Sequence, residues 1–224
     1  MAYRRTERVI QRLSARRDAI VAAARALASE QGMDAVQIAP VAERAAIAAG
    51  TVYRYFPSKT DLVNALVAAV SERELAAMRA AADAAPGPLS ALAAAVVTFA
   101  ARAVQDRRLA WAVIAEPVDA EIGVVRLGYR QALAGEFETR LRAAIAGGHL
   151  PEQDAAHAAQ AVVGALLEGL IGPLARDVGG DAAKLREAVQ MLTLFTLRGL
   201  GIVDARARGL VVQTALPTAD ERAA

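Results

Sequence analysis

The sequence contains no cysteine, which excludes disulfide bonds, cysteine metal sites and a cysteine nucleophile. Histidine occurs only twice, at His149 and His157, near a loop and without a carboxylate–histidine pattern at metal-ligand spacing. The sequence also lacks a phosphate-binding loop and a Gly-x-Ser-x-Gly nucleophile motif. We therefore expect no enzyme activity, no cofactor and no metal ion.

Long apolar runs are missing as well. No uninterrupted stretch reaches the roughly 18 residues that a membrane-spanning helix requires. The longest candidate, residues 155–175, is broken by polar residues and a proline. The basic start of the chain has no apolar segment of the kind that a secretory signal carries. These absences predict a soluble, cytoplasmic protein with no membrane partner.

Positive charge is concentrated near the N-terminus. Residues 1–60 hold ten Lys or Arg against five Asp or Glu, whereas the remaining residues are mildly acidic. Six arginines precede or open the first predicted helix: Arg4, Arg5, Arg8, Arg12, Arg16 and Arg17. Such an arm, disordered in the free protein, could lie along phosphates or enter a minor groove. The distribution is typical of a chain with one end directed at nucleic acid.

Alanine and leucine recur at helical spacing, while glycine and proline fall between the periodic segments, so the chain is predicted to be all-α. We expect about nine helices. The first precedes Gly32, the second and third lie within residues 37–56, and the others cover residues 58–84, 89–105, 109–115, 119–146, 151–174 and 182–197. Beyond Gly199 the periodicity is lost, and a frayed tail is expected.

The segment 38–62 reads as two short helices around a tight turn, followed by the start of a long helix. Val52 and Phe56 lie four residues apart and are expected to pack inward, which leaves Thr51, Arg54 and two tyrosines on the outer surface. This pattern is typical of a helix-turn-helix whose second helix enters the DNA major groove. Ser58 and Asp61 then form a predicted capping box, in which Asp takes the place of Glu.

The residues Gly50-Thr51-Val52-Tyr53-Arg54-Tyr55-Phe56-Pro57-Ser58-Lys59 resemble the signature that closes the DNA-binding domain of TetR-family transcriptional regulators. The resemblance implies a three-helix helix-turn-helix head and a larger helical body for ligand binding and dimerisation. The specific motif covers only residues 38–62. Residues 15–65 match the family in their pattern of apolar and polar residues, and the body matches only in the arrangement of its predicted helices. It also implies phosphate contacts from Tyr53, Tyr55 and Lys59.

The DNA contacts expected on this basis are Gln37, Ala49, Gly50, Thr51, Tyr53, Arg54, Tyr55 and Lys59, with Arg4 and Arg5 from the arm. The sequence departs from the family at Ala46, where glycine is usual in the turn, and at Ala48 and Ala49, where the recognition helix usually has a cap and often a basic residue. Alanine at position 46 requires either a negative φ or some strain. The missing cap costs about 1 kcal/mol.

Two further sites are expected in the body. An effector pocket among the middle helices has six candidate lining residues, although ordinary core is the favoured interpretation for each, since large residues fill helical bodies anyway: Met78, Phe99, Trp111, Tyr129, Phe137 and Met191. The last two long helices carry dense apolar stripes that, by the resemblance, pair across a two-fold axis. The expected dimer contacts are Val163, Leu166, Leu167, Leu170, Leu192 and Phe195.

The predicted organisation is a basic arm at 1–14, a DNA-binding domain at 15–60, a ligand-binding and dimerisation domain at 61–200 and a tail at 201–224. The expected function is that of a homodimeric repressor, which binds a palindromic double-stranded operator and is released by a small apolar or amphipathic effector. Two alternatives stay open: a constitutive DNA-binding protein without an effector, and a helical ligand carrier that has lost operator binding.

Overall fold

The computed structural model describes residues 2–116 and 120–217, with side chains from residue 9 onward. These residues form an all-α fold without strands. The described helices are α1 (Ala2–Gln31), a short 3-10 helix η1 (Met33–Ala35), α2 (Ile38–Arg44), α3 (Ala49–Tyr55), α4 (Lys59–Asp83), α5 (Pro88–Gln105), α6 (Arg107–Ile114), α7 (Ala120–Ala146), α8 (Ala155–Leu170), α9 (Ala182–Gly199) and α10 (Asp204–Gln213).

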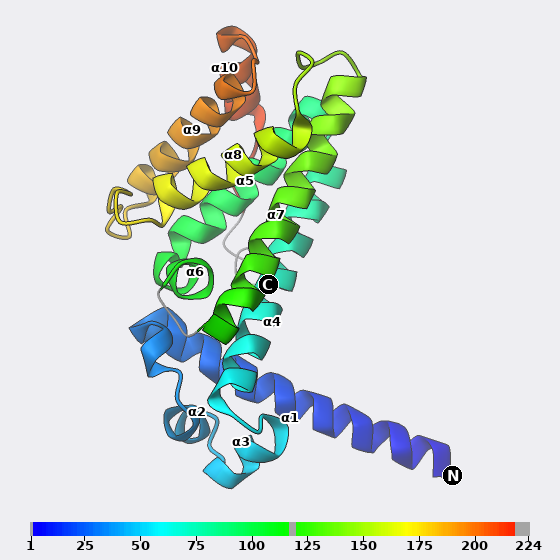
Figure 1. Ribbon diagram of the computed structural model, residues 1–224, viewed down its shortest axis with the longest axis vertical. Coiled ribbons are helices and arrows are strands. Elements are labelled where there is room, and N and C mark those ends of the chain that lie inside the picture. The colour runs from blue at the N-terminus through cyan, green and yellow to red at the C-terminus, as the bar shows by residue number, and fades with distance from the viewer. Residues whose placement is uncertain (1, 117–119, 218–224) are drawn as a thin grey trace.

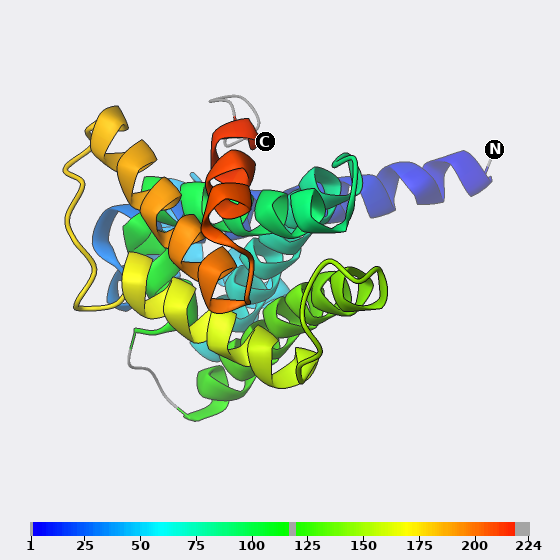
Figure 2. The ribbon, with the colours of Figure 1, turned by 90° about the horizontal axis from the view of Figure 1, so that it is seen from above.

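A small head and a larger body lie at opposite ends of the molecule (Figure 1). The C-terminal part of α1 packs with α2, α3 and the start of α4 to form the head. From there α4 runs into the body beside α5 and α7, while α8 and α9 pack across these helices on one side. Figure 2 shows α8, α9 and α10 grouped at the end of the body that lies away from the head. The helix α4 is therefore shared by head and body.

The centre of the body is α5, of whose 18 residues 14 are buried. This helix is long and apolar enough to cross a membrane by composition alone, but 72% of it is buried inside the protein, as in the core of a globular domain. It contacts α4, α7, α8, α9 and α10, so alanine, valine and leucine side chains on all of its faces find apolar partners.

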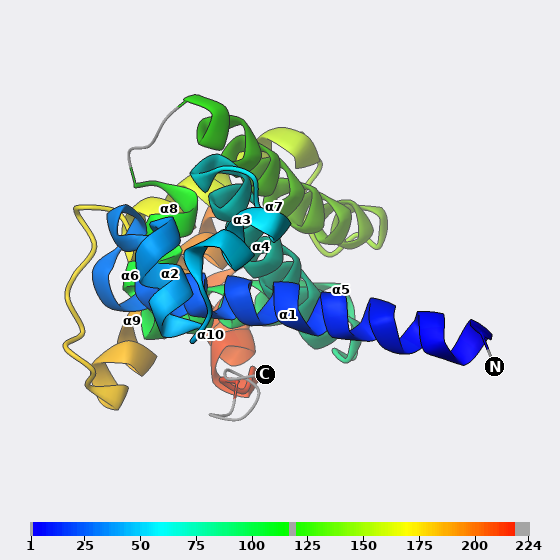
Figure 3. The same ribbon diagram turned by 90° about the horizontal axis from the view of Figure 1, so that it is seen from below.

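The two ends of the chain differ from the sequence-based expectation. The arm predicted before the first helix is instead the start of α1, which runs unbroken from Ala2 because neither glycine nor proline occurs before Gly32. The N-terminal half of this helix projects beyond the rest of the molecule (Figure 3). The predicted tail contains α10, which buries Ala207, Leu210 and Val211 on one face.

Most helix boundaries agree with the sequence pattern, and the exception lies around α8. Pro151 does not open this helix. Asp154 caps it instead, accepting hydrogen bonds from the backbone N–H groups of Ala156 (2.9 Å) and His157 (3.1 Å). A carboxylate cap satisfies two N–H groups that proline would leave exposed, which explains the later start. Asp181 caps α9 in the same way.

Candidate nucleic-acid interface and body cavity

The outward helix of the head is α3, held by two buried side chains on its inner face. Val52 is fully buried and Phe56 is 2% exposed, whereas Tyr53 is 52% exposed. The Arg17 guanidinium of α1 lies 5.2 Å from the centre of the Phe56 ring, a cation–π contact that ties α3 to α1. The predicted inward pair is therefore confirmed, and the opposite face of α3 is open to solvent.

The turn between α2 and α3 carries backbone strain. Ala46 has a φ of +52°, in the left-handed region where an L side chain is disfavoured. The turn is closed by backbone hydrogen bonds from Ala46 N to Glu43 O and from Ile47 N to Ala42 O, both 3.0 Å. Ala48 precedes α3 and offers no side-chain cap. Packing of the head therefore holds a turn in which glycine would be unstrained.

The predicted capping box is present at the start of α4. The Ser58 hydroxyl accepts a hydrogen bond from Asp61 N (3.1 Å), and the Asp61 carboxylate accepts one from Ser58 N (3.0 Å). Lys59, the first residue of α4, is half-buried beside the end of α3. A helix N-terminus and an ammonium group at one point form a favourable place for a phosphate.

The residues expected to contact DNA divide into exposed and half-buried groups. Ala49, Gly50, Tyr53 and Arg54 are exposed on α3, while Thr51 and Tyr55 are half-buried. Tyr55 also packs against the hydrophobic core, so only part of its side chain can face a ligand. The structure thus gathers all six on one short helix.

Four of the expected contacts lie away from α3, and one of them is Lys59 at the start of α4. Gln37 is exposed just before α2, and its side-chain amide donates a hydrogen bond to Asp34 O (3.0 Å). The side chains of Arg4 and Arg5 fall outside the described residues, although both positions belong to α1. Arg12 and Arg16 are exposed on the projecting part of the same helix.

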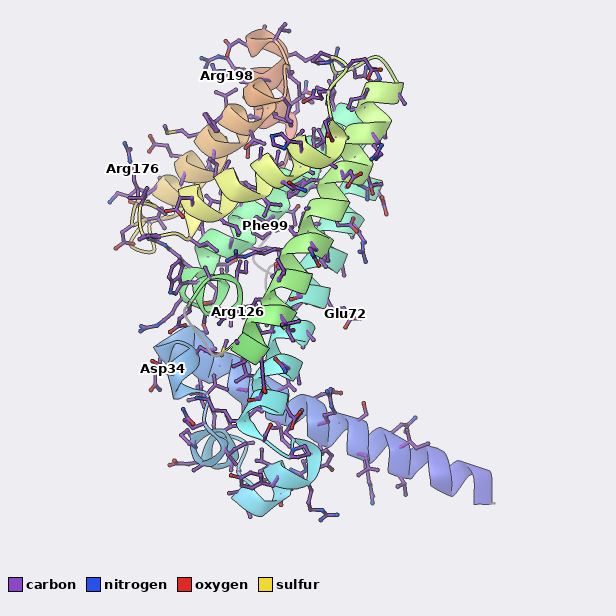
Figure 4. All side chains as sticks on the ribbon, viewed as in Figure 1. Asp34, Glu72, Phe99, Arg126, Arg176 and Arg198 are labelled. Atoms are coloured by element: carbon purple, nitrogen blue, oxygen red, sulfur yellow. The ribbon has the colours of Figure 1, made fainter. Side chains whose placement is uncertain are left out.

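The body contains a cavity of about 650 Å³ between α1, α4, α5, α6 and α7. Phe99 and Tyr129 line it, as two of the six expected residues. The other charged and polar lining residues were not predicted: Arg25, Ser29, Glu74, Arg102, Gln105, Asp106, Arg107 and Arg108. Figure 4 shows Phe99 between α5 and α7, near the centre of the body.

The remaining pocket expectations were wrong. Met78 and Phe137 are at most 1% exposed and fill the core, because large apolar side chains are what a helical body needs there. Trp111 is half-buried on α6 but is not part of the lining. Met191 is 57% exposed on α9, far along the chain from the lining residues.

An ion pair lies at the inner wall of the cavity. Arg102 of α5 donates to the Glu74 carboxylate of α4 through Nε (2.5 Å) and a terminal nitrogen (2.9 Å). The hydrogen bonds to Glu74 raise the pKa of Arg102 despite its burial. Burial raises the pKa of the neighbouring Tyr129 phenol above its ordinary value, so this hydroxyl stays protonated at neutral pH. A sequence signal existed, since Arg102 is the only charged residue in the apolar stretch 89–105.

The helix α6 forms one wall of the cavity and is attached to the head at both ends. At its start, Asp106 accepts a hydrogen bond of 2.8 Å from the Ser29 hydroxyl of α1. Just beyond its end, the Glu116 carboxylate accepts a hydrogen bond of 3.0 Å from Met33 N in η1. A ligand that displaced α6 would therefore act on α1 and η1 of the head.

Two arginines of α7 hold the C-terminal end of α6. Arg126 is 5% exposed and donates to the carbonyl oxygens of Ala112 and Glu116, and Arg130 donates to Ile114 O at 2.9 Å. Cationic donors suit the last carbonyl groups of a helix, which otherwise lack partners. Figure 4 shows Arg126 at this junction of α6 and α7.

The outer face of α8 and α9 exposes large apolar side chains. Leu174 is 82% exposed, Phe195 is 63% exposed and Met191 is 57% exposed. Shallow hollows of about 540 and 530 Å³ lie on either side of Phe195. Gly169 of α8 lies close to Leu192, since a Cβ there would approach its methyl carbons to 3.1 Å. We call the face formed by Leu167, Leu174, Met191, Leu192 and Phe195 the α8–α9 surface.

Half of the predicted dimer contacts are buried within the single chain. Val163, Leu166 and Leu170 are at most 7% exposed in the single chain, because α8 packs with this side against α5 and α7. Leu167 and Leu192 are half-buried and Phe195 is exposed, so these three can still meet a partner. Leu174 and Met191 also belong to the α8–α9 surface; the first lies in the apolar stripe expected at the interface, whereas the second was expected in the effector pocket.

Comparison with known proteins agrees with this architecture. Residues 20–66 match the sequence model of the tetR family of bacterial regulatory proteins. Over 58 residues the chain is 53% identical to the HTH-type transcriptional repressor KstR of Rhodococcus jostii, a match that covers 26% of this chain and only 27% of that repressor.

Solved structures resemble the chain along nearly its whole length. TylP, a TetR regulator from Streptomyces fradiae, is 25% identical over 95% of this chain and 96% of its own, with a TM-score of 0.66. RolR in complex with its ligand resorcinol is 22% identical over 93% of this chain and 98% of its own, with a TM-score of 0.67. Residues 20–66 therefore carry the DNA-binding head of the tetR family of bacterial regulatory proteins, and the chain as a whole shares the all-α fold of solved TetR-type regulators.

Proposed function

We propose that this protein is a DNA-binding transcriptional repressor in which α3 reads the operator from the major groove. The observation that carries this proposal is the geometry of α3, whose Val52 is fully buried while Tyr53 and Arg54 project into solvent. Arg54 and Thr51 are assigned to base edges, and Tyr53, Tyr55 and Lys59 to phosphates. Such a protein would act in the cytoplasm on double-stranded DNA.

The proposed domain organisation follows the fold with two changes. The head comprises α1 to α3, with the basic N-terminal part of α1 as an auxiliary helical contact rather than a separate arm. The body comprises α4 to α10 and therefore includes most of the former tail. The α4 helix begins at the DNA-facing end and continues into the body, so it can carry movement between the two parts.

The protein is further proposed to be a homodimer that uses the α8–α9 surface. This surface exposes more apolar area than an isolated chain needs, and charged residues such as Arg176, Asp177, Lys184 and Glu187 surround it. An apolar centre with a polar rim is the usual composition of an interface. Two heads related by a two-fold axis suit a palindromic operator.

The cavity beside α6 supports an effector-responsive repressor over a constitutive DNA-binding protein. A ligand there would touch α6, which hydrogen-bonds to the head through Asp106 and Glu116. Binding would favour a conformation with altered head spacing, and repression would be relieved by a population shift. KstR is itself named as a transcriptional repressor, and the RolR structure holds resorcinol.

Salt-dependent DNA binding tests the proposed function. Fluorescence anisotropy with labelled duplex DNA should show an affinity that falls steeply as the salt concentration rises, because phosphate contacts release counterions. A protein that binds ligands in its body but shows no DNA binding at low salt would be a carrier. A protein that binds DNA but no small molecule would be a constitutive binder.

A further inference from the structure

The two carboxylates that line the cavity beside α6 are already engaged. The Glu74 carboxylate accepts two hydrogen bonds from Arg102, at 2.5 and 2.9 Å. The Asp106 carboxylate accepts hydrogen bonds from the Ser29 hydroxyl at 2.8 Å and from Leu109 N at 3.2 Å. A ligand donor directed at either carboxylate would have to compete with these contacts.

Two donors of the cavity, by contrast, are available. Tyr129 is 5% exposed, and its hydroxyl has no hydrogen-bond partner among the described residues. Arg25 lines the cavity from α1. Its side chain has neither a hydrogen bond nor an ion pair with any residue that the structure describes. Because Tyr129 lines the cavity, its hydroxyl can donate to a ligand acceptor without breaking a contact within the protein.

Positive charge exceeds negative charge around these donors. Arg25, Arg102, Arg107 and Arg108 line the cavity, against the carboxylates of Glu74 and Asp106. Arg73 adds to the excess nearby. Burial lowers its pKa, and the charges of Arg25 and Arg102 lower it further, against the opposite effect of the Glu74 carboxylate. An anion placed among these three guanidinium groups would be attracted by all three.

The rest of the wall is apolar, with five large side chains facing the space: Val70, Phe99, Leu109, Val113 and Ile114. We propose that the cavity binds an amphipathic anion, whose acidic oxygens face Tyr129 and Arg25 and whose apolar part packs against Phe99 and α6. This inference rests on the proposed function and specifies the effector's chemistry. The volume of about 650 Å³ lies within the range of small-molecule sites.

A matched pair of fluorescent probes tests the charge requirement. The anion is 1-anilinonaphthalene-8-sulfonate, and its uncharged parent is N-phenyl-1-naphthylamine, which lacks only the sulfonate. Both are titrated into the full-length wild-type protein and into Arg25→Gln and Tyr129→Phe. Arg25→Gln removes the positive charge and shortens the side chain, whereas Tyr129→Phe removes the hydroxyl donor at nearly constant size.

Both variants should bind the sulfonate about ten-fold more weakly than the wild type does, because each loses a hydrogen bond to a charged group. Their affinity for the uncharged parent should stay within about two-fold of the wild-type value. Arg142→Gln is the matched control. It removes the same charge from an exposed position on α7 that pairs with Glu138, and it should leave both affinities unchanged. Circular dichroism verifies that the variants are folded.

Absence of sulfonate binding would overturn the proposal, as would sulfonate binding that neither Arg25→Gln nor Tyr129→Phe weakens. Equal losses for both probes would overturn it too, because they would indicate a change of cavity shape. DNA binding is measured separately. If the protein fails to bind DNA but binds the sulfonate in a way that depends on Arg25 and Tyr129, the proposed function is refuted and the anion site is not. If the protein binds DNA but binds both probes equally well, only the proposed negative charge of the effector would be refuted.

Discussion

The Ser29 hydroxyl of α1 donates a hydrogen bond of 2.8 Å to Asp106, the residue that caps the N-terminus of α6. This contact joins residues 77 positions apart, one in the head and one at the wall of the body cavity. Together with the Met33–Glu116 contact at the other end, it makes α6 the direct connection between an effector site and the DNA-binding helices.

The energetic value of this connection can be measured with a double-mutant cycle. Ser29→Ala should lower the free energy of unfolding by about 1 kcal/mol, since it removes one half-buried hydrogen bond. Asp106→Asn keeps a capping oxygen for α6 but loses the charge. In urea denaturation the two substitutions should be non-additive by about 0.5–1 kcal/mol. Strict additivity would mean that the two side chains do not interact in solution.

The strained turn before α3 predicts a stabilising substitution. Ala46→Gly should raise the free energy of unfolding by about 0.5–1 kcal/mol, because glycine adopts φ of +52° without the steric cost that alanine bears. Ala76→Gly is the control on an exposed, regular position of α4 and should be destabilising by about 1 kcal/mol. If Ala46→Gly also destabilises the protein in thermal or urea denaturation, the turn is not strained as described.

The proposed phosphate contact of Lys59 predicts a change that does not depend on DNA sequence. Lys59→Ala should weaken binding to all duplexes alike, and the slope of log K against log salt should fall by about one for each head bound. Arg142→Ala, in the body, should leave that slope unchanged. A loss confined to particular base pairs would instead assign Lys59 to base readout.

The α8–α9 surface predicts which apolar residues hold a dimer together. Phe195→Glu should give a monomer in sedimentation velocity, because a carboxylate would be buried from each protomer at a cost of several kcal/mol. Val124→Glu changes a residue of similar exposure on α7 and should leave the dimer intact. Leu170→Glu should damage the fold itself, since Leu170 is buried within one chain. A stable Phe195→Glu dimer would show that the interface lies elsewhere.

Much of the head could be predicted from sequence because its determinants are local. The Val52 and Phe56 spacing, the Ser58–Asp61 capping box and the breaks at glycine and proline act within a few residues. Burial in the body depends instead on which helix lies opposite. The apolar stripe on α8 has the same sequence pattern whether it packs against α5 or against a second chain. In the structure Leu166 and Leu170 are buried within the single chain.

The cavity was harder to predict for the same reason. Its charged lining joins Arg25, Glu74 and Arg102 from three helices that are separated along the chain, and no spacing rule connects them. Aromatic and methionine residues were a poor guide because Met78 and Phe137 serve the core. The terminal helix α10 was missed because its buried face is short and consists of Ala207, Leu210 and Val211 alone.

The central claim is that α3 reads specific DNA, and selection from a random pool of duplex DNA tests it most directly. The wild-type protein should enrich a two-fold symmetric sequence whose half-sites lie about one helical turn, 34–36 Å, or a multiple of it apart. Arg54→Ala should relax the preference at particular base pairs and cost about 1–3 kcal/mol on the best site. No enrichment by the wild-type protein, or an identical preference from Arg54→Ala with equal losses on all sequences, would contradict the assignment of Arg54 on α3 to base readout.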